Sequence, residues 1–399
     1  MAFKYDVGII GGCGHVGLPL ALTMADTGLR TVIYDINSQS IAAVRKGRMP
    51  FSEEDGEATL QRVFRKGTLE IDDKPERLSE CKFLVLIIGT PVDEHLNPSF
   101  NGMEKALESC LQYLRIGQIL ILRSTVLPGV SAHVQYYLKN KGLNIPVAFC
   151  PERVAQGYSL REFWELPQIV SAFDPQALAE VRGLFGRFSQ ELMELPPMEA
   201  ELAKLMTNAW RYIQFAAANQ FYMIATEHGL DFSRILHACK YKYPRMVGMP
   251  GPGFAAGPCL VKDTMQLAAF CQNQFILGHS AMLINEGLPF HLIKMAERWA
   301  SLADKTVGIL GMAFKAESDD ARDSLSYKLR KLLSLKARRV LCSDPYVRDP
   351  ILVPLEKVLE EAEVIFIGVP HRVYRELKRP PGKIWVDVWD SLPRQEKTS

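Results

Sequence analysis

A glycine-rich motif near the N-terminus constrains the fold of this chain more than any other feature. Residues 5–11 are a short apolar run that predicts a strand, and Gly12, Gly14 and Gly17 then fit the pattern GxGxxG where a helix, 16–28, is expected to begin. Glycines at these places allow a tight turn and let a pyrophosphate approach the helix N-terminus. The sequence therefore predicts a dinucleotide-binding α/β unit at this end of the chain.

An acidic residue, Asp35, ends the second expected strand. A carboxylate here accepts hydrogen bonds from the ribose hydroxyls of NAD and would repel the 2′-phosphate of NADP. We therefore expect NAD as the cofactor, and the alternative is a glycine-rich turn without a ligand. Thr90 and Thr125 follow two later strands and are further candidate contacts, although either could be an ordinary turn residue.

Two stretches in which strands alternate with helices flank a helical segment. The chain has 399 residues, which favours two or three domains. We expect an α/β fold with two Rossmann-like doubly wound domains, 1–197 and 303–399, joined by a central helical domain, 198–302, whose first part, 198–228, is one long helix. The expected strands are 5–11, 30–35, 83–88, 118–122, 145–149, 168–172, 306–311, 339–343, 364–369 and 384–388.

Composition excludes several classes of function. The net charge of +2 is too small to indicate a nucleic acid or membrane partner, and no apolar run has the length of a membrane span. The eight cysteines form no CxxC pair and no zinc-type spacing, so we expect neither a metal site nor a disulfide framework. These features predict a cytoplasmic protein with free thiols.

The long helix carries a polar set on a largely apolar background. Lys204, Asn208 and Arg211 follow the spacing i, i+4, i+7 and therefore share one face. On an arbitrary helix such a set is a solvated stripe. If this face packs against a cofactor domain, the lysine would act as an acid or base or hold a developing alkoxide, and the amide would fix its orientation.

A second chemical feature is the loop of glycine and proline residues at 250–258, which ends at Cys259. Lys262 and Asp263 follow within one turn of an expected helix. A helix N-terminus and a nearby cation both favour the thiolate form of a cysteine. The thiol is therefore a candidate nucleophile; the alternative is a small buried apolar residue.

With these stretches in view, the chain resembles the UDP-glucose/GDP-mannose (nucleotide-sugar) dehydrogenase family over nearly its whole length. The matching stretches are GGCGHVGLPLA, IGTPVDEHLNP, STVLPG, CPERVAQG, AELAKLMTNAWR, YPRMVGMPGPG, GPCLVKD and GMAFKAESDDARDS. The resemblance implies that a sugar C6 alcohol is oxidised twice with two NAD⁺. The cysteine matched by Cys259 adds to the aldehyde, a thioester forms, and water releases the uronic acid.

The same resemblance assigns roles to individual residues and to the three expected domains. The domains would bind NAD (1–197), carry the dimer interface and catalysis (198–302) and bind the nucleotide sugar (303–399). Arg245 would reach the site of a second subunit, which implies a homodimer. The implied catalytic residues are Cys259, Lys204, Asn208, Glu152, Asp263 and Thr125. The implied cofactor contacts are Gly12, Gly14, His15, Val16, Gly17, Asp35, Thr90, Thr125, Lys262 and Arg322. The implied substrate contacts are Glu152, Arg153, Val154, Lys204, Asn208, Arg211, Tyr243, Arg245, Gly253, Phe314 and Lys315.

Some positions depart from the family pattern. Ala255 and Ala256 replace a usual pair of glycines, Ser40 replaces a frequent basic residue, Tyr243 replaces a frequent histidine, and the stretch 385–389 is atypical. These departures leave the sugar open among UDP-N-acetylmannosamine, UDP-N-acetylglucosamine and UDP-glucose. Two alternatives also stay open: a two-electron β-hydroxyacid-type dehydrogenase, which needs no cysteine, and a catalytically silent nucleotide-sugar-binding protein.

Overall fold

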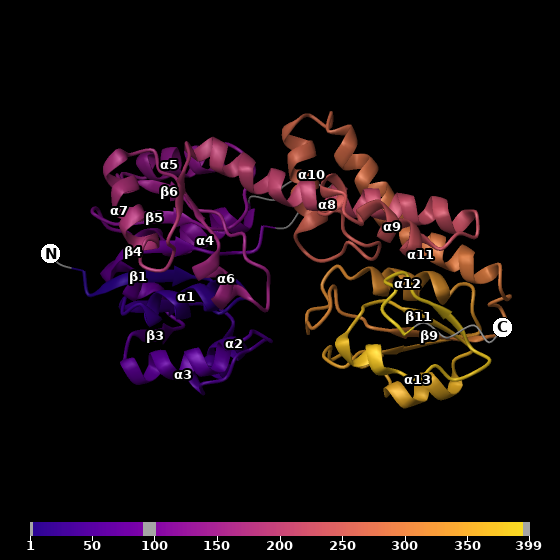
Figure 1. Ribbon diagram of the computed structural model, residues 1–399. Coiled ribbons are helices and arrows are strands. Elements are labelled where there is room, and N and C mark those ends of the chain that lie inside the picture. The colour runs from indigo at the N-terminus through magenta and orange to yellow at the C-terminus, as the bar shows by residue number, and fades with distance from the viewer. Residues whose placement is uncertain (1–2, 91–100, 394–399) are drawn as a thin grey trace. The chain divides into compact units, whose positions relative to one another are not determined.

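The computed structural model describes residues 3–90 and 101–393, which separate into two units, Met1–Thr207 and Asn208–Ser399. Each unit has its own parallel sheet with helices on both faces (Figure 1). The expected α/β fold, with two Rossmann-like sheets and one long helix in the middle of the chain, is confirmed. The division into three domains at residues 197 and 302 stays a prediction.

The larger sheet belongs to the first unit. Within the described residues its strand order is β3-β2-β1-β4-β5-β6, and every neighbouring pair is parallel. The order reverses between β1 and β4, and ligands of open α/β sheets bind beyond the carboxyl ends of the strands at such a point. The strands are β1 Tyr5–Ile10, β2 Thr31–Tyr34, β3 Leu69–Asp72, β4 Cys81–Leu86, β5 Ile119–Leu122 and β6 Val147–Phe149.

Alternating side chains of this sheet enter two separate cores. Val85 and Ile121 pack beneath α1, α3, α6 and α7, whereas Leu84 and Leu122 pack beneath α4, α5 and the start of α8. Both faces are therefore buried, which explains the continuous apolar runs of the strands. The helices are α1 Gly17–Asp26, α2 Ser38–Arg45, α3 Gly56–Lys66, α4 Asn101–Cys110, α5 Val130–Asn140, α6 Ser159–Glu165 and α7 Pro175–Phe185, with short 3-10 turns η1 Pro75–Glu80 and η2 Leu111–Tyr113.

The expected strand 168–172 does not join this sheet. Its ordered part, β7 (Gln168–Val170), pairs instead with β8 (Leu192–Glu194) in a separate two-stranded sheet. Just beyond β7, Ala172 makes a single antiparallel bridge to Ala148 of β6. An apolar run predicts a strand but carries no information about its neighbour, so the partner of this strand could not be read from the sequence.

The helix α8, Pro197–Glu227, contains 31 residues and is therefore about 46 Å long. Its observed ends lie within one residue of the expected range, 198–228. The division between the two units falls between Thr207 and Asn208, inside this helix. No helix in the described part of the chain is both long and apolar enough to cross a membrane.

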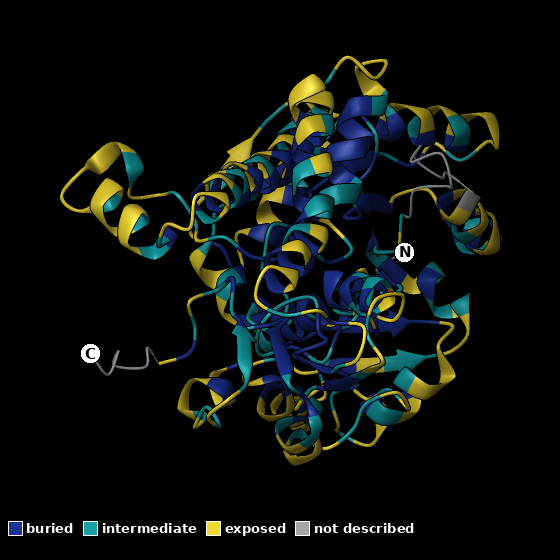
Figure 2. Cartoon of the chain, turned by 90° about the vertical axis from the view of Figure 1, so that its right-hand side faces the viewer, coloured by how far each residue is buried: buried dark blue, intermediate teal, exposed yellow. Residues whose placement is uncertain are grey.

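The second unit has a smaller parallel sheet with the strand order β10-β9-β11-β12. Helices α11 and α12 cover one face, and α13 covers the other (Figure 1). The central strands β9 and β11 are buried throughout, whereas β10 and β12 are partly exposed. Figure 2 shows how buried and exposed residues alternate along the helices of the chain. The strands are β9 Thr306–Leu310, β10 Arg339–Ser343, β11 Val364–Ile367 and β12 Ile384–Val386; the helices are α9 Phe232–Lys240, α10 Leu260–Phe270, α11 Ile276–Glu297, α12 Leu325–Leu333 and α13 Leu355–Glu361, with 3-10 turns η3 Pro244–Met246 and η4 Arg372–Glu376.

Candidate active site

The glycine-rich loop between β1 and α1 packs tightly except at one position. A Cβ built on Gly17 would lie 2.5 Å from the carbonyl oxygen of Gly11, so only glycine fits this helix–strand contact. A Cβ on Gly14, by contrast, would come no closer than 3.8 Å to another atom, and Gly14 is exposed. The loop therefore leaves its backbone accessible at Gly14, shortly before α1 begins, and it fits the phosphates of a dinucleotide.

The carboxylate of Asp35 lies directly beside this loop. Its Oδ2 accepts a hydrogen bond of 2.8 Å from the amide of Cys13, and its Oδ1 accepts one of 2.9 Å from the amide of Asn37. Each oxygen keeps acceptor capacity for a further donor, such as a ribose hydroxyl. In the same loop, the ring of His15 stacks on Phe51 at 4.2 Å between centroids. These residues fit NAD.

The threonines at the ends of β4 and β5 lie together. The hydroxyl of Thr90 donates to the carbonyl oxygen of Thr125 at 2.7 Å, and Ser124 exchanges hydrogen bonds with the backbone of Ile88. The structure therefore brings Thr90 and Thr125 to one edge of the sheet, as expected for the carboxyl ends of adjacent parallel strands. Val16 is the N-cap residue of α1 in the same region.

Glu152 follows β6 and is buried, and protein donors contact both of its oxygens. Oε1 accepts hydrogen bonds from the amides of Arg153 and Val154, at 2.6 and 2.8 Å. Oε2 accepts a hydrogen bond from the guanidinium of Arg123, which is also buried. Burial lowers the pKa of Arg153, and the charge of Arg123 acts in the same direction against the attraction of Glu152. Glu152 thus organises the three-residue segment 152–154.

The polar set on α8 is not uniform. Lys204 and Asn208 are buried, at 8% and 6% exposure, whereas Arg211 is exposed. The solvated-stripe reading therefore does not describe the lysine and the asparagine. Within the second unit, the amide nitrogen of Asn208 donates to Oδ2 of Asp263 at 2.6 Å. This hydrogen bond joins α8 to the first turn of α10.

Cys259 is the N-cap residue of α10 and is exposed. In the following turn, Nζ of Lys262 lies 3.3 Å from Oδ1 of Asp263, a buried oxygen that receives no hydrogen bond from the described residues. Hydrogen bonds to Asp320 raise the pKa of Arg322 above its ordinary value, and the charge of Cys259 contributes to this rise. Arg322 is therefore an electrostatic neighbour of the thiol, and a helix N-terminus and a nearby cation are the surroundings typical of reactive cysteines.

The loop that leads to Cys259 is held by a buried amide network. Asn219 of α8 accepts a hydrogen bond from the amide of Gly253 at 2.8 Å and donates to the carbonyl oxygen of the same residue at 3.0 Å. It also donates to Asn285 of α11 at 2.9 Å. On the other side, a Cβ built on Gly253 would lie 2.1 Å from the ring of Trp389. The loop is therefore fixed between α8 and the segment after β12.

The two alanines of this loop do not have equivalent surroundings. Ala255 is buried in a small core with Tyr212, Leu260 and Ala281, so its methyl group fills space inside the protein. Ala256 is partly buried. The methyl group that replaces a hydrogen at Ala255 therefore packs inside the protein.

The remaining candidate substrate residues lie in two places of the second unit. A Cβ built on Gly257 would lie 2.5 Å from the ring of Phe314, so Phe314 and its neighbour Lys315 belong to the surroundings of the cysteine loop. Tyr243 and Arg245 are exposed at the short turn η3, and the guanidinium of Arg245 lies 5.6 Å from the centroid of the Tyr243 ring. The structure does not bring Tyr243 or Arg245 into the network around Cys259 within the described residues of one chain.

Sequence reasoning missed several residues that organise these sites. Arg123 stands immediately after an apolar strand, and Asn219 stands in an apolar part of α8, so each could have been noticed as a polar residue in a buried pattern. Trp389 belongs to the stretch 385–389, which is atypical of the family, and nothing in the sequence connects it with Gly253. Asp344 and His371, which support the loop before Phe314, gave no signal.

Comparison with known proteins gives a consistent result along the chain. Models of the UDP-glucose/GDP-mannose dehydrogenase family match in three parts: the NAD binding domain at residues 5–189, the central domain at 198–286 and the UDP binding domain at 308–393. A relative, UDP-N-acetyl-D-mannosamine dehydrogenase of Pyrococcus horikoshii, is 29% identical over 380 residues, covering 92% of this chain and 90% of the relative.

Solved structures agree with this result. The UDP-D-ManNAc dehydrogenase of Pyrococcus horikoshii is similar with a TM-score of 0.88 and 26% identity, over 96% of this chain and 99% of the other. A UDP-glucose dehydrogenase of Pyrobaculum islandicum is similar with a TM-score of 0.87 and 25% identity, over 97% and 95% of the two chains. The similarity therefore extends over both units.

Proposed function

This chain belongs to the UDP-glucose/GDP-mannose dehydrogenase family, and from this premise we propose that it oxidises the C6 hydroxyl of a nucleotide sugar to a uronic acid in two NAD-dependent steps. It is an NAD-binding oxidoreductase of the nucleotide-sugar dehydrogenase type. The observation that carries the four-electron proposal is the exposed Cys259 at the N-terminus of α10, with Lys262, Asp263 and Arg322 around it.

The proposed chemistry assigns a step to each of these groups. The glycine-rich loop and Asp35 would hold NAD⁺, which would accept one hydride in each of the two oxidations. In the first oxidation the C6 hydroxyl would lose its proton to Lys204 and C6 would lose a hydride, which leaves the aldehyde. The Cys259 thiolate forms a C–S bond to the aldehyde carbon, and the carbonyl oxygen takes the negative charge that Lys204 and Asn208 stabilise. Loss of hydride from this carbon gives a thioester. Water then attacks, the C–S bond breaks, the thiolate leaves, and the carboxylate is released.

Hydrolysis needs a group that accepts a proton from water. Oδ1 of Asp263 suits this task, because it is buried, lies one turn from the thiol and receives no hydrogen bond from the described residues. Its partner oxygen is held by Asn208, which fixes the direction of the carboxylate. We assign Asp263 to the water, together with Glu152 and Thr125 as the family resemblance implies.

The substrate class follows from the relatives. Curated relatives named UDP-N-acetyl-D-mannosamine dehydrogenase support a UDP-sugar, with UDP-N-acetylmannosamine first among the candidates before UDP-N-acetylglucosamine and UDP-glucose. The proposed contacts in the second unit are Phe314 and Lys315 beside the cysteine loop, with Gly253 and Arg211. Arg153 and Val154 are proposed contacts in the first unit.

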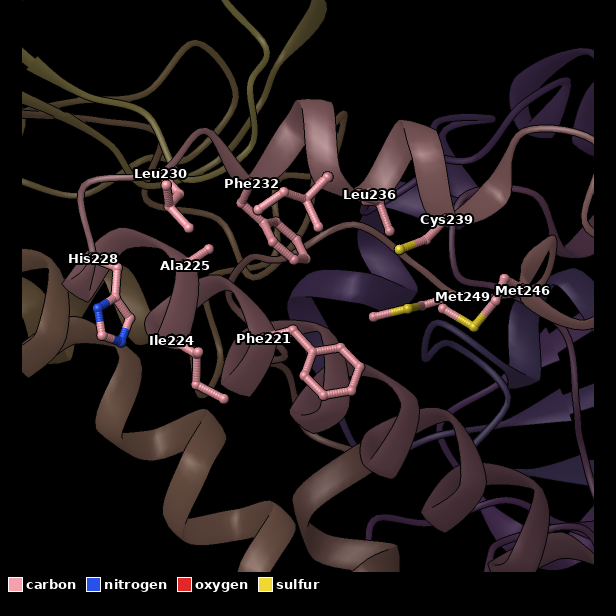
Figure 3. A pocket seen from close by; sticks show the side chains of 11 residues that line it. Phe221, Ile224, Ala225, His228, Leu230, Phe232, Leu236, Cys239, Met246 and Met249 are labelled. Atoms are coloured by element: carbon pink, nitrogen blue, oxygen red, sulfur yellow. The ribbon is translucent and has the colours of Figure 1, made fainter.

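We also propose a homodimer through the central helices. An apolar pocket of about 260 Å³ lies between α8, α9 and η3, and side chains such as Phe221, Ile224 and Leu230 line it (Figure 3). Phe221 and Ile224 are 49% and 50% exposed in the single chain, so both contribute apolar surface at this pocket. A second copy would cover this surface and would bring its Arg245 to the site. A cytoplasmic location stays a prediction.

The deciding experiment is the amount of NADH formed per sugar with UDP-N-acetylmannosamine, UDP-N-acetylglucosamine, UDP-glucose and GDP-mannose. Two NADH per sugar support the proposal, one supports a two-electron dehydrogenase, and binding without NADH supports a silent protein. Cys259→Ser should abolish acid formation. Cys271→Ser is a matched control, since Cys271 is also exposed and is the C-cap residue of the same helix.

A further inference from the structure

Arg123 is a buried cation that the proposed chemistry does not use. Its side chain follows β5 and is 0% exposed. The guanidinium donates to the carboxylate of Glu152, to the carbonyl oxygen of Cys150 at 3.0 Å and to Oε1 of Gln168 at 2.9 Å. It also lies 5.0 Å from the centroid of the Phe185 ring. A charge removed from water in this way is tolerated only when it is paired and hydrogen-bonded.

The partner of this cation is the carboxylate that fixes the segment after β6. One oxygen of Glu152 accepts the hydrogen bond of Arg123, and the other accepts the amides of Arg153 and Val154. The carboxylate therefore joins the end of β5 to the backbone that follows β6. Without Arg123, Oε1 of Glu152 would keep its two backbone amides, but Oε2 of this buried carboxylate would have no hydrogen-bond donor among the described residues.

We propose that Arg123 is a positioning residue for Glu152: it fixes the direction of this carboxylate and, through it, the backbone of residues 152–154 in the active enzyme. The proposal rests on the proposed function for the role of Glu152. A lysine cannot replace Arg123, because one planar fork of N–H groups reaches three acceptors, two in the segment 150–152 after β6 and one at Gln168 of β7.

The test is a double-mutant cycle that uses Arg123→Gln, Glu152→Gln and the double variant in the full chain. We expect Arg123→Gln to lower kcat by about 10- to 100-fold when Glu152 is present, because a carboxylate without its charged partner changes direction. In the Glu152→Gln background the same change should lower kcat less than about threefold. The KM for NAD should stay unchanged, and Arg123→Lys should restore only part of the activity.

A structural role alone predicts a different pattern. In that case Arg123→Gln would lower kcat by equal factors in both backgrounds, in parallel with the melting temperature, and this result would overturn the proposal. Phe185→Leu is the matched control, because Phe185 packs on the Arg123 guanidinium without a hydrogen bond to Glu152 in the described structure. It should lower the melting temperature and leave kcat unchanged.

The proposed function and this inference fail in different ways. If the unmodified enzyme forms no NADH with any nucleotide sugar, the proposed function fails, and the same cycle is then measured by melting temperature and by proteolysis of residues 151–157. Arg123→Gln should lower stability and expose this segment, and the double variant should recover both, because it removes the unpaired charge. Additive losses without recovery would overturn the positioning role.

Discussion

The two sheets of this protein place an aspartate at the same point but use it differently. In the first unit, Asp35 follows β2 and accepts the amide of Cys13 in the loop after β1. In the second unit, Asp344 follows β10, the neighbour of β9, and accepts the amides of Met312 and Ala313 in the loop after β9, at 2.6 and 3.0 Å. In both units, the aspartate thus follows the strand beside the first strand of the sheet and accepts amides from the loop after that first strand.

The difference lies in how many donors each carboxylate has. Besides Met312 and Ala313, Asp344 accepts hydrogen bonds from the amides of Tyr346 and Val347 and from Nε2 of His371. Nδ1 of His371 accepts the amide of Glu317, so the ring proton is on Nε2. Asp35, by contrast, has two amide partners in the described structure. One carboxylate keeps capacity for a ligand, and the other has become part of the loop it supports.

The largest expected effect concerns what the two units share. Gly11 and Gly311 both have positive φ, at 77° and 92°, and a Cβ would lie 2.0 Å from the carbonyl oxygen of Ile87 and 2.6 Å from the amide nitrogen of Val369, respectively. Gly11→Ala and Gly311→Ala should each lower the free energy of unfolding by about 3 kcal/mol or more, measured by urea denaturation. Gly67→Ala, with φ of 65° but open space around it, should cost only about 1 kcal/mol.

The next largest expected effect is the contribution of the Asp344 carboxylate to the stability of the folded protein. Burial alone would raise the pKa of Asp344, but hydrogen bonds from His371 and from backbone amides outweigh it and lower the pKa to about 2. Because this value lies below the unfolded value of 3.8, the stabilisation is present above about pH 4 and is lost as the pH falls towards 2. Asp344→Asn should cost roughly 2 kcal/mol near pH 6. If the difference in free energy of unfolding between Asp344→Asn and the unmodified protein stays constant down to pH 2.5, the lowered pKa of Asp344 is contradicted.

A smaller effect concerns cofactor binding. Asp35→Asn should raise the KM for NAD about tenfold, which corresponds to about 1.4 kcal/mol, because the ribose hydroxyls lose a charged acceptor. The melting temperature should change little. Asp344→Asn serves as the control in the same assay and should leave the KM for NAD unchanged at pH 7. Equal changes in KM for the two variants would show that the carboxylates do not differ in the way described.

The smallest expected effect on stability comes from a hydrogen bond close to Asp344. The hydroxyl of Tyr346 donates to Oε2 of Glu317 at 3.0 Å, and Glu317 also accepts the amide of Arg372. Tyr346→Phe should lower the free energy of unfolding by about 0.5–1 kcal/mol, since it removes one exposed hydrogen bond. Tyr136→Phe, on the outer side of α5, should change it less. Calorimetry of both variants at pH 7 makes this comparison.

Much of the fold was predictable because its strongest signals are local. The turn at Gly12–Gly17 and the long helix α8 follow from glycine spacing and from helical periodicity, and both lie where expected. The strand β3 was missed, and the partner of β7 was wrongly expected in the main sheet. Which strands become neighbours depends on packing between distant segments, and a short apolar run does not encode it.

The candidate site shows the same limit. Cys259, Lys262 and Asp263 lie within one turn of a helix start, so sequence spacing alone brought them together. The bond between Asn208 and Asp263 joins residues 55 positions apart and was not predictable from spacing. The supporting residues Arg123 and Asn219 act through acceptors that the folded backbone supplies, so single-residue patterns could not reveal their partners.

The contact of Trp389 with Gly253 joins two segments that are synthesised at different times. The loop before Cys259 is synthesised before the ring that packs on it, because Trp389 lies in the segment that follows β12, near the end of the 399-residue sequence. Until that segment emerges, a nascent chain carries the thiol without the tryptophan that fixes its loop. A polypeptide that ends between these two points therefore carries Cys259 but lacks the ring that packs against its loop.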